Sequence, residues 1–456
     1  MMGIFMSMSM RVSLNMAVVC MVNSTAISND YDNATEFIDM ITEKDEKCPR
    51  ISVEEEQSRG YHGTFLWSSS DQSLLLSASF YGGLVPVWFA GFLADRFGPK
   101  LMLFLGNFTA LGVTLLTPLL VNFNFYALLV ARFVMGIGEG FIFPSVTSLI
   151  ARWIPKNERS TSAAIITSGN QIATIFGLWF SSVLCGSELF GGWPLIFYFF
   201  GFLACIWCIL WLYFVTNSPE KQLHISGEEL VYLQEQLASQ SIFYKSGSNK
   251  LYSSPIPWFK ILTSIPVIVN FFAELVHMFS LTLMQTYLPL FMKQILRMNL
   301  SKNGLYSMAP FLIQLVTKNL FAMLSDYLKR KGYISNTVGC KIFQFVAPVC
   351  GFFTSQLSVA PQYTGVLISI SRLATIAGGA AAVNVVGYVN KHGTLEESRT
   401  IWLIITGMNV FMGIIYVLFS SAEIQPWAKQ PEKEEVLSSG KNTPENQNLE
   451  STNLKS

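Results

Sequence analysis

Charged side chains are scarce in this sequence. Asp, Glu, Lys and Arg make up 13% of its 456 residues, whereas ~25% is usual for a soluble domain. Hydrophobic residues make up 51%, and the mean hydropathy is +0.42. These values exclude a soluble enzyme of two or three domains, because apolar runs of ~20 residues, long enough to cross a bilayer, recur along the chain. The net charge of +1 comes from basic residues scattered over short loops, so we expect no nucleic-acid partner.

Signatures of disulfide-rich, redox and catalytic proteins are also missing. The seven cysteines lie mostly inside apolar segments and predict no disulfide framework. Cys205 and Cys208 form a CxxC inside an apolar span, where plain packing is a simpler interpretation than a redox or metal role. The sequence contains no HExxH, GxSxG, P-loop or GxGxxG, so we expect no enzyme, no resident cofactor or metal, and no ATP-driven transport.

The first half predicts six membrane spans. Residues 1–22 form the first, with Arg11 interrupting the apolar run, so that Arg11 needs an anion or a carboxylate nearby. Residues 23–72 are polar and acidic and predict an extracellular or lumenal loop, where Asn33 is the candidate for glycosylation. The rest of this bundle covers residues 73–215, with spans predicted at Leu74–Ala94, Leu101–Val121, Tyr126–Leu149, Ser162–Leu184 and Trp193–Val215.

The distribution of Lys and Arg predicts the orientation of these spans. Basic residues occur in alternate connections, such as those holding Arg96 and Arg152, and are missing from 121–125 and 186–192. Lys and Arg favour the cytoplasmic side of a membrane. We therefore expect a cytoplasmic N-terminus and a cytoplasmic linker at residues 216–263.

The second half predicts a shorter bundle over residues 264–420, followed by a disordered cytoplasmic tail at 421–456. Its spans are Val267–Phe291, Leu305–Leu324, Tyr363–Val389 and Ile401–Phe419. Phe343–Leu357 is too short to cross comfortably. The loop from Lys293 to Lys302 carries three basic residues on the expected outer side, against the charge rule.

Two ionisable residues lie inside one apolar span. Arg132 and Glu139 are seven residues apart, so both project from nearly the same helix face, and Gly136, Gly138 and Gly140 leave little bulk beside them. A buried charge in a bilayer costs from ~3 to over ~10 kcal/mol unless it faces a partner or a wet cavity. One interpretation is a structural salt bridge that joins two helices. The other, which we favour, is that Arg132 attracts an anion while Glu139 carries a proton.

The turn between the second and third spans carries a motif. It reads GFLADRFGPK, in which Gly98 permits a tight turn and Asp95 can pair with a basic residue or a helix end. Arg96 and Lys100 fix the cytoplasmic face, and Gly91 opens the motif. A weaker echo, LSDYLKRK around Asp326, occurs where a repeat of the first half would place it.

These residues resemble the signature loop GxLADRxGxK of the major facilitator superfamily. RFVMGIGEG, RWIPKNERS and APQYTG extend the resemblance to its anion-transporting group of type I sodium–phosphate cotransporters, sialin and the vesicular glutamate transporters. The resemblance implies an all-α membrane protein of two pseudo-symmetric helical bundles, a central anion site, and coupling to Na⁺ or H⁺. By resemblance, Arg11, Arg132 and Glu139 match the family's charged positions, and His277 stands where the glutamate group has Arg. His277 is equally compatible with plain helix packing.

The second half departs from the family pattern. Sixty residues separate Asp95 from Pro155, but only 35 separate Asp326 from Pro361, so about one helix is missing. A shortened isoform without transport activity, or a membrane receptor or scaffold, is therefore an alternative function.

The favoured hypothesis is a secondary active transporter of small anions such as phosphate, urate-like organic anions, sialate or acidic amino acids. Arg11 and Arg132 would supply positive potential, His277 would contribute to substrate binding from the other half, and Glu139 would couple transport to Na⁺ or H⁺. The membrane would be the plasma membrane or an endolysosomal or vesicular one.

Overall fold

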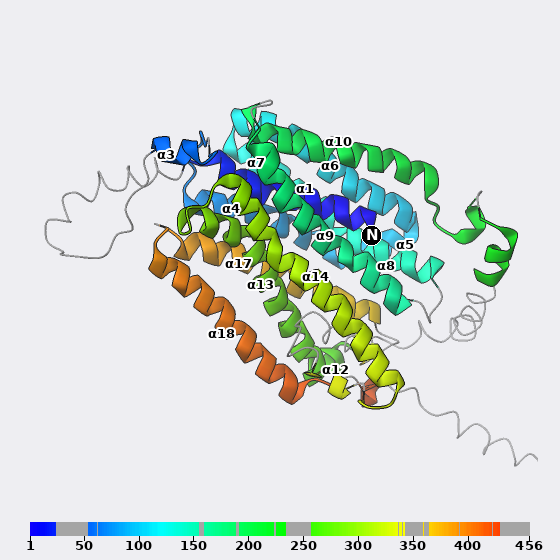
Figure 1. The fold of residues 1–456 in the computed structure, drawn as a ribbon. Helices are drawn as coiled ribbons and strands as arrows, with labels where there is room; N and C mark the ends of the chain where they lie inside the picture. The colour runs from blue at the N-terminus through cyan, green and yellow to red at the C-terminus, as the bar shows by residue number, and fades with distance from the viewer. Residues whose placement is uncertain are drawn as a thin grey trace, which may run out of the picture.

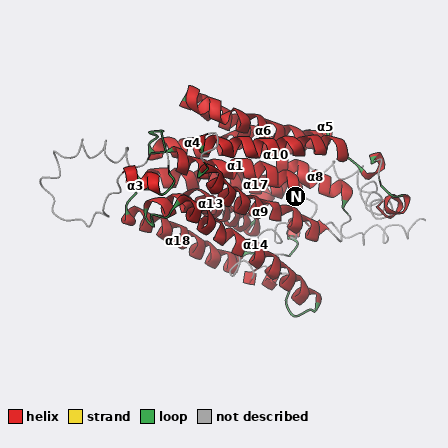
Figure 2. Ribbon diagram, turned by 45° about the horizontal axis from the view of Figure 1, so that its top comes forward, coloured by secondary structure: helices red, strands yellow, loops and turns green. Residues whose placement is uncertain are grey.

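The structure is a computed structural model in which α-helices account for most of the described chain, and no β-strand occurs among the residues it describes (Figure 2). The predicted glycosylation site Asn33, the short segment Phe343–Leu357 and most of the predicted tail lie outside the described residues. The structure describes residues 1–23, 53–61, 63–154, 159–187, 191–222, 225–233, 257–335, 337–339, 341–342, 359, 364–391, 393–421 and 423–428.

The first half of the chain begins with a helix that starts at Met2 and continues as a bundle (Figure 1). After α1 and the short helix α3, the chain returns beside the end of α1, where Asn23 N–H donates to Phe65 O at 3.0 Å. The helices are α1 (Met2–Met21), α3 (Val53–Ser58), α4 (Ser69–Leu84), α5 (Ala90–Phe97), α6 (Pro99–Phe123), α7 (Phe125–Gly140), α8 (Ile142–Trp153), α9 (Arg159–Cys185) and α10 (Trp193–Phe214).

One of the predicted spans is sharply bent in the structure. The span predicted at Leu74–Ala94 bends by 63° where the 3-10 turn η1 (Pro86–Trp88) separates α4 from α5. The span predicted at Tyr126–Leu149 remains one span, Phe125–Ile150, although Phe141 separates α7 from α8. Proline explains both interruptions, because Pro86 opens η1 and Pro144 cannot donate to Gly140 O.

Among the described residues, the second half has fewer helices than the first. They are α12 (Trp258–Leu262), α13 (Ile265–Gln294), α14 (Leu300–Arg330), α17 (Thr364–Val389) and α18 (Leu395–Phe419). Among the described helices of the whole chain, seven are long and apolar enough to cross a membrane, or eight if the bent α4–α5 pair counts as one span. The chain is thus a multi-pass membrane protein.

The two halves repeat one packing pattern. In the first half α1 packs against α9 and α10, and in the second half α13 packs in the same way against α17 and α18. Across the interface between the halves, α9 packs against α14 and α4 packs against α17. By this pattern α17 and α18 correspond to α9 and α10, and the counterparts of α6 and α7 would have to fall in residues 331–363. That stretch is too short for two spans of ~20 residues, in agreement with a shortage of about one helix.

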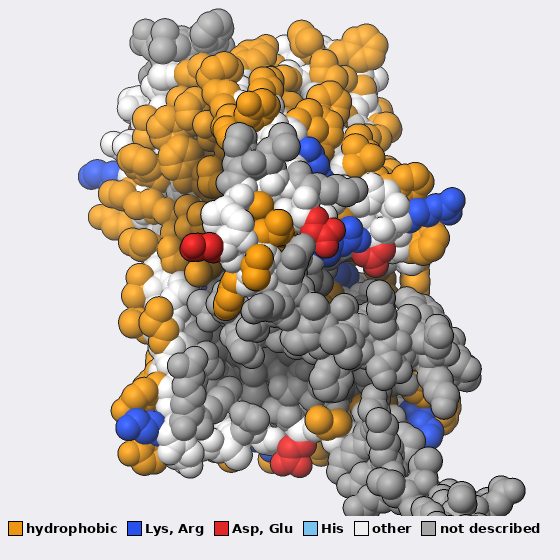
Figure 3. Space-filling model, turned by 90° about the vertical axis from the view of Figure 1, so that its right-hand side faces the viewer, with side chains coloured by type: hydrophobic (Ala, Val, Ile, Leu, Met, Phe, Trp, Pro, Cys, Tyr) orange, Lys and Arg blue, Asp and Glu red, His pale blue; other side chains and the backbone are white. Residues whose placement is uncertain are grey.

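The outer surface of the bundle matches a lipid environment. Large hydrophobic side chains, including Phe123, Phe202 and Phe411, are more than half exposed. Figure 3, which views the molecule from the right-hand side of Figure 1, shows hydrophobic side chains over the upper part of this face and charged side chains at its middle, its edges and its lower part. Arg11, Arg132 and Glu139, described below, are largely buried.

Candidate functional site

The GFLADRFGPK motif fastens the turn between α5 and α6 to neighbouring helices. Gly98 has φ 92°, a left-handed conformation that favours glycine. Asp95 Oδ1 accepts a hydrogen bond from Ser148 Oγ at 2.9 Å and lies 3.5 Å from Arg152 Nη2, so the acid ties α5 to α8. Lys100 Nζ donates to Leu212 O at 2.8 Å, near the end of α10.

The remaining motif residues make fewer contacts. Arg96 lies 5.8 Å from the centre of the neighbouring Phe97 ring, and a Cβ added at Gly91 would meet nothing within 4 Å. Asp326 lies near the end of α14, the counterpart of the α4–α5 pair. The motif therefore fixes one end of the first bundle and does not contribute to an interior site.

An ion pair joins α1 to α7 in the interior. Arg11 Nη1 lies 3.4 Å from Glu139 Oε2, and the two side chains are 21% and 10% exposed. The Arg11 guanidinium also lies 3.7 Å above the ring of Phe80 on α4, a cation–π contact. Arg11 Nη2 and Glu139 Oε1 are buried without a hydrogen bond. Arg11 Nη2 can therefore donate a further hydrogen bond, and Glu139 Oε1 can accept one.

Arg132 lies on the same helix as Glu139 but makes its hydrogen bonds to other residues. Its Nη2 donates to Thr117 Oγ1 on α6 at 3.2 Å, and its Nη1 lies 3.3 Å from Met135 Sδ. The side chain is 2% exposed. Arg132 extends across to α6 while Arg11 approaches Glu139 from α1, so spacing along α7 alone could not identify the partner of Glu139.

A small cavity of about 20 Å³ lies between the halves at this level, room for about one water. Arg11 and Arg132 line it from the first half, and α13 lines it from the second half with hydroxyl and amide groups. Asn15 Nδ2 donates to Gln285 O at 3.3 Å beside the cavity, and Gln285 Nε2 donates to Thr174 Oγ1 at 2.8 Å. The remaining polar lining residues are Ser79, Thr282 and Thr286.

His277 lies on α13 but does not line this cavity. It lies two turns before Gln285, close enough to Lys318 of α14 for their charges to interact. Lys318 Nζ in turn donates to Thr167 Oγ1 of α9, in the first half, at 3.1 Å. His277 therefore belongs to a second polar layer, separate from Arg11 and Glu139.

Two ionisable residues of this second layer, Glu274 and Arg372, were not among the site residues predicted from the sequence. Thr375 Oγ1 of α17 donates to Glu274 Oε1 of α13 at 3.0 Å. Arg372, one turn before Thr375, has its Cζ 3.4 Å from the ring centre of Phe143 on α8. The signal that singled out Arg132, a charge interrupting an apolar run, was present for both.

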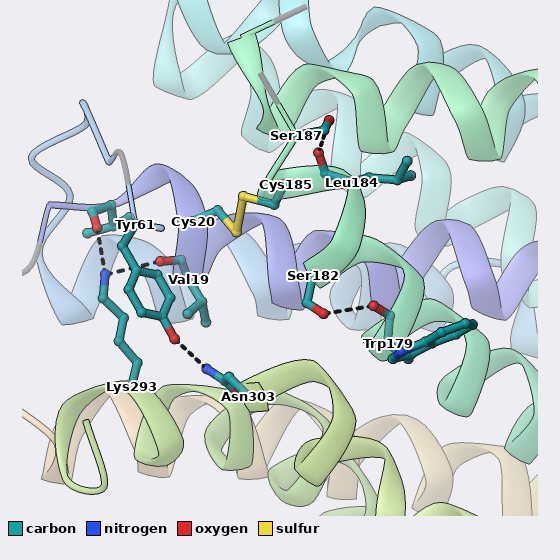
Figure 4. The surroundings of a disulfide bond; sticks show 11 residues. Val19, Cys20, Tyr61, Trp179, Ser182, Leu184, Cys185, Ser187, Lys293 and Asn303 are labelled. Carbon is teal, nitrogen blue, oxygen red and sulfur yellow. Dashed lines mark hydrogen bonds between the residues drawn. A yellow bond between two sulfur atoms is a disulfide. The ribbon is translucent and has the colours of Figure 1, made fainter. Parts of the chain in front are cut away.

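Polar contacts close the interface between the halves at the end where α1 finishes (Figure 4). Lys293 Nζ donates to Val19 O at 3.1 Å and to Val22 O at 3.2 Å. Tyr61 OH accepts from Asn303 Nδ2 at 3.0 Å and donates to Met298 O. The sequence placed Lys293 in a basic outer loop, but α13 includes it and it is only 6% exposed. Its ammonium caps the carbonyl end of α1 instead of facing water.

A disulfide lies at the same end, although the sequence predicted no disulfide framework. Cys20, at the end of α1, is bonded to Cys185, at the end of α9 (Figure 4). Cys20 lies inside the first predicted span and Cys185 directly follows the span predicted at Ser162–Leu184, and a sequence separation of 165 concealed that these two spans run parallel and finish together. Cys205 and Cys208 are free, with Cys205 exposed and Cys208 buried.

A larger cavity of about 470 Å³ lies elsewhere, among the start of α1, α8 and α10. Its lining is mostly apolar, with Leu103, Trp153 and Trp211 among the residues that form it. It includes none of the charged residues above, so the small central cavity is the better candidate for a polar ligand.

Two helical bundles that repeat one packing pattern around a charged interior cavity define the class of multi-pass membrane carriers. A family profile described as the Major Facilitator Superfamily matches residues 1–415, and the chain belongs to this superfamily. The solved structures that it resembles have the same fold. One is the inward-open xylose transporter XylE from E. coli, at a TM-score of 0.57 and 14% identity over 92% of this chain and 95% of that one. Another is a bacterial Spinster homologue in an inward-facing, occupied conformation, at 0.53 and 12% over 93% and 98%.

Curated relatives align over most of the chain. An uncharacterized transporter of Caenorhabditis elegans, slc-17.3, is 31% identical over 96% of this chain and 89% of its own. Sialin of Homo sapiens is 28% identical over 93% and 88%. Sodium-dependent phosphate transport protein 3 of Mus musculus is 27% identical over 93% of both.

Proposed function

We propose that this protein is a secondary active transporter of small anions, driven by Na⁺ or H⁺, and that transport rather than catalysis is its function. The observation that carries the proposal is the Arg11–Glu139 pair beside the central cavity, which leaves Arg11 Nη2 and Glu139 Oε1 without a hydrogen bond. The relatives named for sialin and for sodium-dependent phosphate transport support an anionic substrate.

The arrangement links anion binding to cation binding. When the halves move apart and the small cavity widens, a carboxylate or phosphate that reaches Arg11 competes with Glu139 for its guanidinium, whose fork suits both anions. Glu139, once displaced, is a buried carboxylate that needs a proton or Na⁺. Arg132, which is hydrogen-bonded to Thr117, adds positive potential at the cavity. Binding of either ion therefore favours binding of the other, which is the basis of symport.

Alternating access follows from the two-bundle plan, in which the halves rock around a midplane site. The contacts of Lys293 and Tyr61 close the end of the interface at which α1 finishes. A disulfide requires an oxidising compartment, so the Cys20–Cys185 end would be extracellular or lumenal and both chain termini cytoplasmic. Residues 216–263 would then be the cytoplasmic linker, and residues 23–72 the outer loop that carries Asn33.

Uptake into proteoliposomes tests the proposal. Labelled phosphate, urate, sialate and glutamate are offered in turn under a Na⁺ gradient and under a H⁺ gradient. Arg11→Gln should lower uptake by roughly tenfold or more, since a charge-assisted hydrogen bond is lost. Arg399→Gln, which removes an exposed cation from α18, is the matched control and should transport normally. Unchanged uptake by Arg11→Gln, or binding without flux by the unaltered protein, would contradict the proposal.

A further inference from the structure

The interior contains a second layer of charged residues beyond Arg11 and Glu139. It combines Glu274 on α13 and Arg372 on α17, with Lys318 on α14 nearby. Each residue interrupts a helix of the second half at a depth where an unmatched charge is costly. Neither the ion pair of the first half nor the motif loop uses them.

The two layers lie at different depths. Asn15 contacts Gln285, and Val19 contacts Lys293, so α1 and α13 run side by side in the same direction. Counted from the Asn15–Gln285 contact at 1.5 Å per residue, Arg11 lies roughly 6 Å back along α1 and Glu274 roughly 16 Å back along α13. The second layer is therefore about 10 Å nearer to the end where α1 begins.

Arg372 faces the first half of the molecule. Its guanidinium covers the ring of Phe143, four residues after Glu139 along the chain. Among the described residues none accepts a hydrogen bond from Arg372, and its side chain is half-buried. Stacking on an aromatic ring holds the plane of a guanidinium while leaving its N–H fork available for a carboxylate or phosphate.

Glu274 supplies a resident negative charge. The hydroxyl of Thr375 holds its carboxylate against α17, one helical turn from Arg372, and the two opposite charges attract each other. Among the described residues of the two layers, cations outnumber carboxylates, a balance that favours anions over cations as cargo. The cations are Arg11, Arg132, Lys318 and Arg372, and the carboxylates are Glu139 and Glu274.

We propose that Arg372 forms a second anion-binding site, which takes the carboxylate or phosphate group of the substrate after it leaves Arg11. Glu274 is the counter-ion that the substrate displaces, and Lys318 adds positive potential. This inference rests on the proposed function. Arg11 and Arg372 are then two consecutive binding sites on one path, which leads towards the end of the molecule where α1 begins.

Flux and binding measurements on full-length protein in proteoliposomes test the inference, with labelled phosphate, sialate and glutamate as probes. Arg372→Gln should lower flux by roughly tenfold or more, while an anion still binds at Arg11. Arg11→Gln should lose both binding and flux. Glu274→Gln removes the competing carboxylate and should strengthen anion binding, and this gain should vanish in Glu274→Gln/Arg372→Gln.

A charge reversal separates a binding site from a structural ion pair. If Arg372 and Glu274 only stabilise the fold, Arg372→Glu/Glu274→Arg should restore flux, because the pair is re-formed with its partners exchanged. Restoration would overturn the inference, as would wild-type flux in Arg372→Gln. If the unaltered protein neither binds nor moves any of the three anions, the proposed function fails and the second site fails with it.

Discussion

Arg11 of α1 and Glu139 of α7 form an ion pair across the interior, with Nη1 3.4 Å from Oε2. Since Glu139 is the only carboxylate bonded to Arg11 among the described residues, Glu139→Gln should free Arg11 for the anion while removing the group that binds a proton or Na⁺. We expect anion exchange to persist and gradient-driven uptake to fall roughly tenfold or more. Counterflow and gradient-driven uptake, measured on the same proteoliposomes, separate the two activities. Normal gradient-driven uptake would contradict the coupling role of Glu139.

Substitutions of Arg132 can separate a structural role from a role in transport, because Arg132 is almost fully buried and is hydrogen-bonded to Thr117. Arg132→Met keeps much of the side-chain volume and removes a buried charge, a change that is often neutral or stabilising. Arg132→Ala leaves a cavity and should cost ~2–5 kcal/mol of unfolding free energy. We expect Arg132→Met to melt at or above the temperature of the unaltered protein and to lose anion uptake. Normal uptake by Arg132→Met would make Arg132 structural only.

The sequence predicted the parts of this molecule that depend on local pattern. Long apolar runs indicated the spans, and charges within them singled out Arg11, Arg132 and Glu139. Gly98, with φ 92°, occupies the tight turn that its motif indicated. The family and the two-bundle fold followed from the same short segments and are confirmed by the match over residues 1–415.

Contacts between residues that are far apart in the chain could not be predicted from the sequence. The choice of Arg11 over Arg132 as the partner of Glu139 depends on how α1 approaches α7, which no spacing within α7 encodes. The Cys20–Cys185 bond requires knowing that α1 and α9 finish at one end. Lys293 was interpreted as a loop residue because its acceptors, Val19 O and Val22 O, belong to the other half of the chain.

Gly136 lies where α7 approaches α4 closely. A Cβ added there would overlap Ser79 O and the rest of the Ser79 backbone. Since backbone cannot move aside as a flexible side chain can, we expect Gly136→Ala to cost ~1–3 kcal/mol of stability. Gly112→Ala, on α6 where nothing lies within 4 Å, is the matched control and should not destabilise the protein. Thermal unfolding of the purified variants in detergent measures both, and equal melting temperatures would contradict close α4–α7 packing.

Lys293 joins the halves at the end where α1 finishes, through hydrogen bonds of 3.1 and 3.2 Å to Val19 O and Val22 O. Lys293→Met removes these bonds and keeps an unbranched apolar side chain, so the closed arrangement of this end should lose ~1–3 kcal/mol relative to the open one. Spin labels are placed at the exposed positions Leu66 and Leu395, one in each half. Double electron–electron resonance should then measure a longer mean distance between the two labels. Lys391→Met removes an exposed cation that lies over the ring of Tyr388 within the second half, and should leave the distance distribution unchanged. An unchanged distribution in Lys293→Met would show that Tyr61 and its partners close this end without Lys293, because Tyr61 OH is bonded to both Met298 O and Asn303.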